Sequence, residues 1–413
     1  MGGLLFNLMK KNKKIIGISI CIIVFIGLYA IISTYKNNNK GVDGVNNQDG
    51  VNERAINGNL IFIEGKNEFN KGILENVDII QDNNNSLNNN IKEDTIVLKS
   101  KNGKYVKEGT FISEVIDTED FNKLILSWNA ETPEKTYIEV EARAYTNTSQ
   151  WTEWLSWGVW GTGIERASKS TACNLAKVDT DTLIIKGDET YANKIQVRVK
   201  LYSKSSKVTP ILTRITVSYI NSENKVIDAF NGDINLSIVE KVIETPKISQ
   251  MLRDKRIASR ICSPTSMTML LNRLGENLIV EDVAWSSYDY NYDGFGNWVY
   301  NVAFAGSLGH QAYVKFGSLE DLKNEIEDGY PVATSVKYTN DIDNDKYPYI
   351  ENAPLTTSGH LIVVCGFSNK NGEQYVVVND PAAEDDESVR VEYRLEQFME
   401  AWSNSDYIMY IVH

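Results

Sequence analysis

Cys262 has the residue type and the setting of a sulfur nucleophile. It stands directly before Ser263-Pro264 and an apolar stripe at helical spacing that ends near Gly275. Proline suits the start of a helix, where its missing N–H costs nothing, Ser263 is expected to cap the free amides, and glycine suits the stop. We therefore expect a helix over 264–274, with Cys262 at the positive end of its dipole, where the thiolate is favoured over the thiol.

His360 and Asp380 are the residues best placed to activate this sulfur. His360, one of three histidines, opens the strand-like run 360–367, and Asn371-Gly372 predicts a hairpin turn before a return strand over 374–380. If the residue numbers of an antiparallel pair sum to about 740, His360 lies opposite Asp380, with Cβ atoms about 5 Å apart. Any other short-loop register brings them within a residue or two, so Asp380 is expected to hold the imidazole.

These residues predict acyl chemistry through a thioester. The Cys262 thiolate would attack a carbonyl carbon, and His360 would take the thiol proton and pass it to the leaving amine. Asp380 would orient the ring and stabilise the imidazolium. The oxyanion needs donors; the backbone N–H of Cys262 is one, and the side-chain amide of Gln250 is the best candidate for the other.

The other cysteines lack partners for such chemistry. Cys365 is an odd number of positions from His360, so on a strand it points to the opposite face and is expected to be a buried thiol. Cys173 has no histidine nearby in the sequence, although a Cys173–Cys365 disulfide is allowed. Cys21 lies within an apolar run. The four cysteines form no CxxC pair and no zinc spacing, so no disulfide framework is required.

No metal or cofactor is expected. The segment 289–294 imitates the first half of a calcium loop, but Tyr300 stands where an EF-hand needs a bidentate glutamate. We expect this loop to shape the cleft instead, with Trp298 as a wall.

An apolar run near the N-terminus predicts a membrane anchor. Residues 15–32 would reach roughly 27 Å as a helix, enough to cross a thin bilayer. Four lysines precede the run, so the positive-inside rule places the N-terminus in the cytoplasm and the remainder outside. The alternative is a cleaved signal peptide and a secreted protein, although no small-residue cleavage site follows. A net charge of -13 without a basic patch argues against nucleic acid as a partner.

The chain divides into segments of different composition. After the cytoplasmic stub and anchor, an Asn-rich stretch is typical of a linker, and many short alternating strands then predict an all-β, jelly-roll-like sandwich. A connector separates this sandwich from a mixed α+β domain that includes helices over 264–274 and 318–328. The predicted segments are 1–35, 36–58, 59–225, 226–245 and 246–413.

Four tryptophans fall three apart at Trp151, Trp154, Trp157 and Trp160. Such a group suits either a surface on which sugars stack or a set of indoles that fills a core or a seam between domains. Because large aromatic side chains dominate protein cores, burial is the expectation.

Six blocks of the C-terminal part occur in a consistent order and resemble the papain-like bacterial family related to bacteriocin-processing, double-glycine cysteine peptidases. The blocks lie within 248–386 and the resemblance covers about 246–413. It implies a papain-like α+β fold with Cys262 as nucleophile, His360 as base, Asp380 as orienting residue and Gln250 as oxyanion donor. Residues 110–133 resemble the sandwich that often precedes this domain. The blocks are ISQM, CSPTSMTMLL, DGFGNWVYNVAFAGSLG, AYVKFGSLEDLKNEIEDGYPV, GHLIVVCGF and VVVNDPAAEDD.

Two departures from the family pattern are visible. Ile261 stands where an aromatic residue often precedes the cysteine, and Ser263 stands where many relatives carry glycine. Neither removes a reacting group. The sequence thus predicts a membrane-anchored, outward-facing cysteine peptidase or amidase that acts on a peptide or protein, cell-wall-associated material included. An acyltransferase that uses the same triad and a non-catalytic surface binding protein remain alternatives.

Overall fold

The computed structural model describes residues 59–80, 92–224 and 240–413. These residues belong to one compact unit, Arg54–His413. Within the described ranges, no helix combines the length and the apolar character that a membrane crossing needs. Three predicted segments lie wholly or mostly outside these ranges: the anchor 15–32, the linker 36–58 and the connector 226–245.

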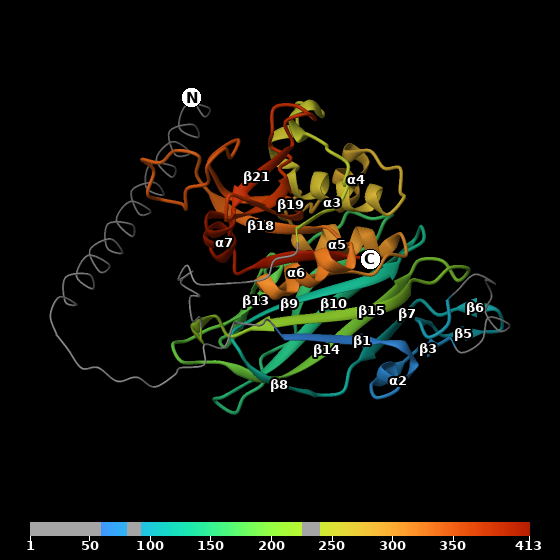
Figure 1. Ribbon diagram of the computed structural model, residues 1–413. Coiled ribbons are helices and arrows are strands. Elements are labelled where there is room, and N and C mark those ends of the chain that lie inside the picture. The colour runs from blue at the N-terminus through green and yellow to red at the C-terminus, as the bar shows by residue number, and fades with distance from the viewer. Residues whose placement is uncertain (1–58, 81–91, 225–239) are drawn as a thin grey trace, which may run out of the picture. The chain divides into compact units, whose positions relative to one another are not determined.

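Two antiparallel β-sheets share one hydrophobic core over the N-terminal half of the described chain (Figure 1). The first sheet has the order β12-β13-β9-β15-β4-β3, with β1 also paired to β15; the second has the order β11-β10-β14-β7-β2, with β8 paired to β14. The strands of the first sheet are β1 (Asn59–Glu64), β3 (Val77–Ile79), β4 (Ile96–Leu98), β9 (Lys123–Glu131), β12 (Ala176–Asp179), β13 (Thr182–Ile185) and β15 (Ile211–Ile220). Those of the second are β2 (Ile73–Glu75), β7 (Glu108–Ile112), β8 (Ile116–Phe121), β10 (Thr136–Thr146), β11 (Leu155–Trp160) and β14 (Ala192–Ser203). Short elements complete this part: α2 (Gly65–Phe69), β5 (Ser100–Lys101), β6 (Lys104–Tyr105) and η2 (Ser222–Asn224).

Strict alternation of residue types explains why these strands form a two-layer structure. On β10, Ile138, Val140 and Ala142 are fully buried in the shared core, whereas the residues between them point to the outer face. Because side chains alternate between the two faces of a strand, an apolar-polar repeat buries one face and leaves the other polar. The alternating strands predicted for this segment are thereby confirmed at β10, which spans Thr136–Thr146.

The tryptophan repeat is divided between the core and the surface. Trp157 and Trp160 are fully buried, and Trp160 packs edge-on against Trp128 and near Tyr300. Trp151 and Trp154 are only half-buried. The expected burial is therefore confirmed for two of these indoles and wrong for the other two.

A third antiparallel sheet with helices on both faces forms the C-terminal part. Its order is β17-β22-β18-β19-β20-β21, with β16 paired to β19. The helices α3 and α5 contribute to the core on one face of this sheet, and α6 and α7 to the core on the other. The strands are β16 (Lys241–Val242), β17 (Ala312–Phe316), β18 (Val332–Tyr338), β19 (Thr357–Lys370), β20 (Glu373–Asn379), β21 (Arg390–Arg394) and β22 (Ile408–Val412). The helices are η3 (Gln250–Leu252), η4 (Ala258–Arg260), α3 (Cys262–Arg273), α4 (Val280–Ser287), α5 (Trp298–Ser307), α6 (Leu319–Asp328) and α7 (Leu395–Ser403).

Several boundaries differ from the sequence prediction, among them those of α3, which spans Cys262–Arg273 rather than 264–274. The third sheet already includes β16, because Lys241 and Val242 pair with Phe367 and Gly366, so the predicted connector 226–245 overlaps the sheet. The helix predicted over 318–328 begins at Leu319, since the side chain of Ser318 accepts the backbone N–H of Asp321 as an N-cap.

Side chains of the first sheet form hydrogen bonds with β17, the edge strand of the third sheet. The side chain of Asn129 donates to the carbonyl of Ala312 at 2.7 Å and accepts its N–H at 3.3 Å. The next two outward N–H groups on this edge, those of Val314 and Phe316, donate to the hydroxyls of Ser127 and Ser218. An unpaired strand edge is a site of aggregation, so the sandwich contributes to the integrity of the third sheet.

Candidate active site

Cys262 is the first residue of α3. Ile261 is the N-cap and provides no side-chain cap, and the backbone N–H of Thr265 is the first to donate back, to the carbonyl of Ile261. Pro264 lacks an N–H that would have no partner at this position. The predicted capping role of Ser263 is wrong, because its hydroxyl is hydrogen-bonded to the buried Tyr410 hydroxyl at 2.8 Å. The predicted stop is confirmed, since Gly275 follows the helix with a φ of 103°.

The sulfur of Cys262 lies in a site that stabilises a thiolate. Burial raises the pKa of this thiol, but a hydrogen bond to the His360 ring and the charge of that ring outweigh burial, so the pKa is lowered overall. The backbone N–H groups of Leu361 and Ser263 lower the pKa further. Amides at a helix start favour an anion, which is the effect expected from the sequence.

His360 joins the sulfur to Asp380. Its Nε2 is 2.7 Å from Oδ1 of Asp380, and both side chains are almost completely buried. Because Nε2 is used in this contact, Nδ1 is the nitrogen left to face Cys262. The three residues that the sequence grouped as a triad are thus brought together.

The strand register behind this contact differs from the prediction. Val363 pairs with Asn379 and Val364 with Val378, so the residue numbers sum to 742, and beyond an irregularity at Cys365 the sum becomes 743. Asp380 lies just past β20 rather than opposite His360. A bulge adds one residue to one strand, which sequence periodicity alone does not reveal.

Two tyrosines that sequence reasoning missed fix the carboxylate of Asp380. Tyr338 and Tyr393 donate their hydroxyls to Oδ2 at 2.7 and 2.9 Å, and the backbone N–H of Ala382 donates to Oδ1 at 2.9 Å. Tyr338 also stands edge-on to the imidazole of His360, with ring centroids 5.9 Å apart. Tyr338 could have been found from the apolar, strand-like run over 332–338, because Val336 on that strand pairs with His360. Tyr393 had no such signal, because β21 was not predicted.

The buried pair is charged. For His360, burial lowers the pKa, but the carboxylate of Asp380 and the sulfur of Cys262 raise it, to about 10. For Asp380, burial raises the pKa, while the charge of His360 and the hydrogen bonds from His360 and Tyr338 lower it below its ordinary value. His360 is therefore held as an imidazolium beside a carboxylate, and its charge favours the thiolate form of Cys262 over the thiol.

Gln250 is attached to the segment that follows Asp380. It begins η3, is 4% exposed, and its backbone N–H donates to the carbonyl of Pro381 at 2.8 Å. The neighbouring Ser249 strengthens this attachment by donating its hydroxyl to the carbonyl of Ala383. The side-chain oxygen of Gln250 is buried with no partner among the described residues. A buried acceptor without a partner is uncommon. It is the N–H of this amide, not its oxygen, that an oxyanion would need.

The other two cysteines of the described ranges, Cys173 and Cys365, do not belong to the triad. Cys365 is fully buried and its pKa is raised to about 11 by burial, which makes it a poor nucleophile. Cys173 is half-buried, and both are free thiols, so the disulfide allowed by the sequence does not form. The predicted exclusion of Cys365 from the site agrees with these surroundings.

The loop 289–294 is held in its conformation by hydrogen bonds to the side chain of Asp289, its first residue. Asp289 is fully buried and accepts the backbone N–H groups of Ser168, Asn291 and Tyr292 and the side-chain amide of Asn297. No group of three or more candidate metal ligands occurs in the described part of the chain. The bond from Ser168 joins this loop to the sandwich.

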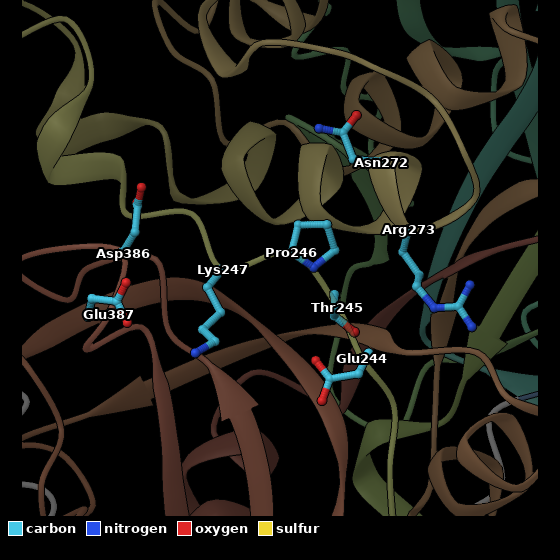
Figure 2. A pocket seen from close by; sticks show the side chains of 8 residues that line it. All are labelled: Glu244, Thr245, Pro246, Lys247, Asn272, Arg273, Asp386 and Glu387. Atoms are coloured by element: carbon cyan, nitrogen blue, oxygen red, sulfur yellow. The ribbon is translucent and has the colours of Figure 1, made fainter.

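A polar cavity of about 520 Å³ lies at the far end of α3 from Cys262 (Figure 2). Asn272 and Arg273, at the end of that helix, form part of its wall. Asp386, also in the wall, accepts the backbone N–H of Ser249, next to Gln250. Through Asp386 the cavity therefore borders Ser249, the residue before Gln250. Cys262 is not among its lining residues. The other lining residues of the cavity are Glu244, Thr245, Pro246, Lys247 and Glu387.

Comparison with known proteins identifies the family. Residues 242–409 match the Peptidase_C39 like family, and residues 60–219 match the peptidase C39 N-terminal domain. Both parts of the described chain are thus similar to domains of C39-like peptidases. The C39-like segment contains the triad residues, and the N-terminal segment corresponds to the two-sheet part. No curated protein sequence matches the chain.

Three solved structures resemble parts of this C39-like protein. The peptidase domain of Streptococcus ComA, a bi-functional ABC transporter involved in a quorum sensing pathway, is 18% identical; the match covers 42% of this chain and 97% of that chain, with a TM-score of 0.26. TmCBM61 in complex with beta-1,4-galactotriose is 10% identical, with coverages of 36% and 89% and a TM-score of 0.22. The enzymatically active domain of bacteriophage CBA120 tailspike protein 4 is 11% identical, with coverages of 40% and 19% and a TM-score of 0.18.

Proposed function

We propose that this C39-like protein is a membrane-anchored, extracytoplasmic cysteine peptidase or amidase whose triad is Cys262, His360 and Asp380. One observation carries the proposal: the imidazole of His360 contacts the Cys262 sulfur on one side and lies 2.7 Å from Asp380 on the other. Burial by itself would neutralise all three groups, so the charged arrangement is a feature typical of functional sites.

The first half of the reaction forms a thioester. The Cys262 thiolate attacks the carbonyl carbon of the scissile amide and generates a tetrahedral oxyanion. The backbone N–H of Cys262 and the side-chain amide of Gln250 are the proposed donors to this oxyanion. When the intermediate collapses, the C–N bond breaks and the His360 imidazolium protonates the leaving amine.

The second half restores the thiolate. His360, now neutral, takes a proton from water as that water attacks the thioester carbonyl, and the carboxylic acid product leaves. Asp380 keeps the ring in place through both halves, because its own position is fixed by Tyr338 and Tyr393. An amine in place of water would give acyl transfer with the same residues.

The fold assignment that accompanies this proposal is a papain-like domain preceded by a jelly-roll-like sandwich. It is supported by the family matches and by a cysteine at a helix start that faces a histidine on a neighbouring sheet. The proposed location is supported by the sequence of residues 15–32 and the lysines before it. Labelling of intact cells with a membrane-impermeant thiol reagent tests the location, since Cys173 is half-buried and should react from outside.

Cleavage profiling tests the activity. The full chain in detergent is incubated with a peptide library, beside Cys262→Ala and His360→Ala variants, and products are identified by mass spectrometry with and without an added amine. New carboxyl termini that depend on both residues support the peptidase. Amide products in the presence of the amine would instead establish the acyltransferase, and an inert chain with an unreactive Cys262 would leave a binding protein.

A further inference from the structure

Two buried charged side chains of the sandwich face helix ends of the C39-like segment. Arg166 is 5% exposed and Asp181 is 8% exposed. Among the described residues, neither is paired with a side chain of opposite charge. A buried charge without such a partner is costly, so each of the two needs another source of stabilisation.

The guanidinium of Arg166 completes the C-terminal end of α4. Its Nη2 donates to the carbonyl of Trp285 at 2.5 Å, and its Nη1 donates to the carbonyl of Gly161, within the sandwich, at 3.2 Å. The N–H of Asp289 would donate to the Trp285 carbonyl if the helix continued, but it donates to Gly294 instead. Because the last carbonyls of a helix lack partners and carry partial negative charge, a cation is favoured at this end.

Asp181 provides the opposite charge at the start of α5. Its Oδ2 accepts the backbone N–H of Trp298, the first residue of that helix. The first N–H groups of a helix lack partners and favour an anion. Since α4 ends at Ser287 and α5 begins at Trp298, the two charges lie at the two ends of the loop 288–297. The sign of each charge matches the helix end that it faces.

The same loop is bound to the sandwich between its ends. The N–H of Ser168 donates to the carboxylate of Asp289 at 3.0 Å, and the N–H of Tyr290 donates to the backbone carbonyl of Arg166 at 2.9 Å. The backbone that supplies these groups is itself fixed, because Ala167 pairs with β11. The position of the loop is therefore set from the sandwich.

The loop also contacts the segment that leads to Cys262. The side chain of Arg260 donates to the carbonyl of Asp293, and Ile261 shares a buried apolar cluster with Phe295. Ile261 is the N-cap of α3, so its backbone determines where Cys262 begins the helix. A displacement of the loop would therefore move the thiol relative to the imidazole that it faces.

We propose that the sandwich is a positioning domain for the nucleophile, and that Arg166 and Asp181 set the place of Cys262 through the loop 288–297. Packing alone does not call for these two charges, because apolar side chains of similar volume fill a core at lower cost. Their value lies in the match to two helix ends that flank one loop. The inference rests on the proposed function for its catalytic consequence, since a misplaced thiol matters where the thiol reacts.

Hydrogen exchange of the full chain in detergent, followed by mass spectrometry, tests the positioning. Arg166→Met keeps most of the side-chain volume and removes the charge. It should speed exchange at least about tenfold in peptides from 286–297 and 257–263, because a hydrogen bond from a charged group is lost. Peptides from β20 (373–379) should keep the wild-type rate. Unchanged exchange at 257–263 overturns the proposal.

Arg143→Met is the matched control for this measurement. Arg143 is a half-buried arginine of the same domain, and its hydrogen bonds stay within the sandwich. Its substitution should leave exchange at 257–263 and 286–297 unchanged. If Arg143→Met sped exchange in these two segments as much as Arg166→Met, the effect would belong to the domain as a whole, and the proposal would be wrong.

Two further variants separate positioning from a general loss of stability. Arg166→Lys retains a cation at the end of α4, so its exchange rates should lie between those of the wild type and Arg166→Met. Arg260→Ala removes an exposed contact with Asp293 and leaves the sandwich intact. It should speed exchange at 257–263 but not at 286–297. Equal acceleration in every segment of Arg166→Met, β20 included, would assign Arg166 to stability alone and contradict the proposal.

Cleavage of a peptide that the wild type accepts gives the catalytic readout. In Arg166→Met, kcat per Cys262 that iodoacetamide labels should fall about 10- to 100-fold with KM nearly unchanged, because a small misplacement of a reacting group costs this much. Arg166→Lys should recover part of the loss. A wild-type kcat in Arg166→Met would refute the proposal. If the wild type cleaves no peptide, the proposed peptidase fails, and the exchange pattern still decides whether the sandwich positions Cys262.

Discussion

Asp181 of the sandwich accepts a hydrogen bond from the backbone N–H of Trp298, the first residue of α5, at 3.1 Å. Its carboxylate thus lies at the positive end of a helix that belongs to the C39-like segment. A bond within the sandwich fixes the position of Asp181, since the indole N–H of Trp157 donates to its backbone carbonyl at 2.7 Å. The two domains are therefore joined through buried polar contacts, which are costly to break.

The titration of Asp181 should make stability fall as the pH rises. Burial raises its pKa to about 7 although the Trp298 N–H opposes this, whereas an unfolded aspartate titrates near 3.8. Between these pH values the folded chain keeps a proton that the unfolded chain releases, so the free energy of unfolding decreases with pH over this window, by up to about 4 kcal/mol. Asp181→Asn removes this slope, and urea unfolding at about pH 5 and about pH 8 measures it.

The exposed Asp188 provides the control for this comparison. Asp188→Asn lies in the same domain and should keep the wild-type dependence on pH. Parallel stability curves for Asp181→Asn and the wild type would show that Asp181 does not titrate in the window.

Alkylation of Cys262 should begin at a lower pH than that of an ordinary thiol. Burial opposes ionisation of this thiol, but His360 outweighs burial and lowers the pKa below its usual value near 9. In His360→Ala the burial remains and the compensation is lost, so the midpoint of iodoacetamide labelling should move to higher pH. Peptide-level mass spectrometry separates Cys262 from the half-buried Cys173. A labelling midpoint at about pH 8.5 that is the same in the wild type and in His360→Ala would refute the ion pair.

The elements of the site were predictable where local sequence dictates them. The helix start at Cys262 and the stop at Gly275 follow from proline and glycine chemistry, and the Asn371-Gly372 turn determines which strands lie side by side. These signals were enough to predict that Cys262, His360 and Asp380 lie close together.

Long-range packing accounts for what the sequence did not reveal. The irregularity at Cys365 shifts the register because β16 passes beside it: a Cβ on Gly366 would lie 1.9 Å from the carbonyl oxygen of Lys241. Tyr393 reaches Asp380 from β21, a short strand whose partner is known only once the sheet is built. The division of the tryptophans between core and surface depends on the path of β11. The regular spacing of three residues in the sequence does not indicate this path.

The tyrosines that bind Asp380 should each contribute measurably to stability. Tyr338→Phe and Tyr393→Phe each remove a donor to a buried carboxylate, so each should lower the free energy of unfolding by about 1.5–3 kcal/mol. Tyr375→Phe is the matched control, because that hydroxyl donates to the exposed Glu373 at a similar distance of 2.8 Å. Its expected cost is below about 0.5 kcal/mol. Equal costs for the buried and exposed tyrosines would mean that Asp380 does not depend on these donors.

Substitution of Gln250 should separate oxyanion stabilisation from activation of the thiol. Gln250→Ala keeps the backbone N–H that donates to Pro381, so the segment after Asp380 should stay in place. The loss of one donor should lower kcat by about 10²–10³-fold, measured on the peptide cleaved by the wild type. Labelling of Cys262 should keep its dependence on pH, because no contact of the thiolate with His360 changes.

The neighbouring Met251 gives the matched control for this prediction. Met251 is exposed, and Met251→Ala removes a side chain from the same short helix without touching the amide of Gln250. It should hydrolyse the peptide at nearly the wild-type rate. If Gln250→Ala also did so, Gln250 would not be the oxyanion donor. If it instead shifted the labelling midpoint as His360→Ala does, its role would be to support the ion pair, because a donor that acts only in the transition state leaves the free thiolate unchanged.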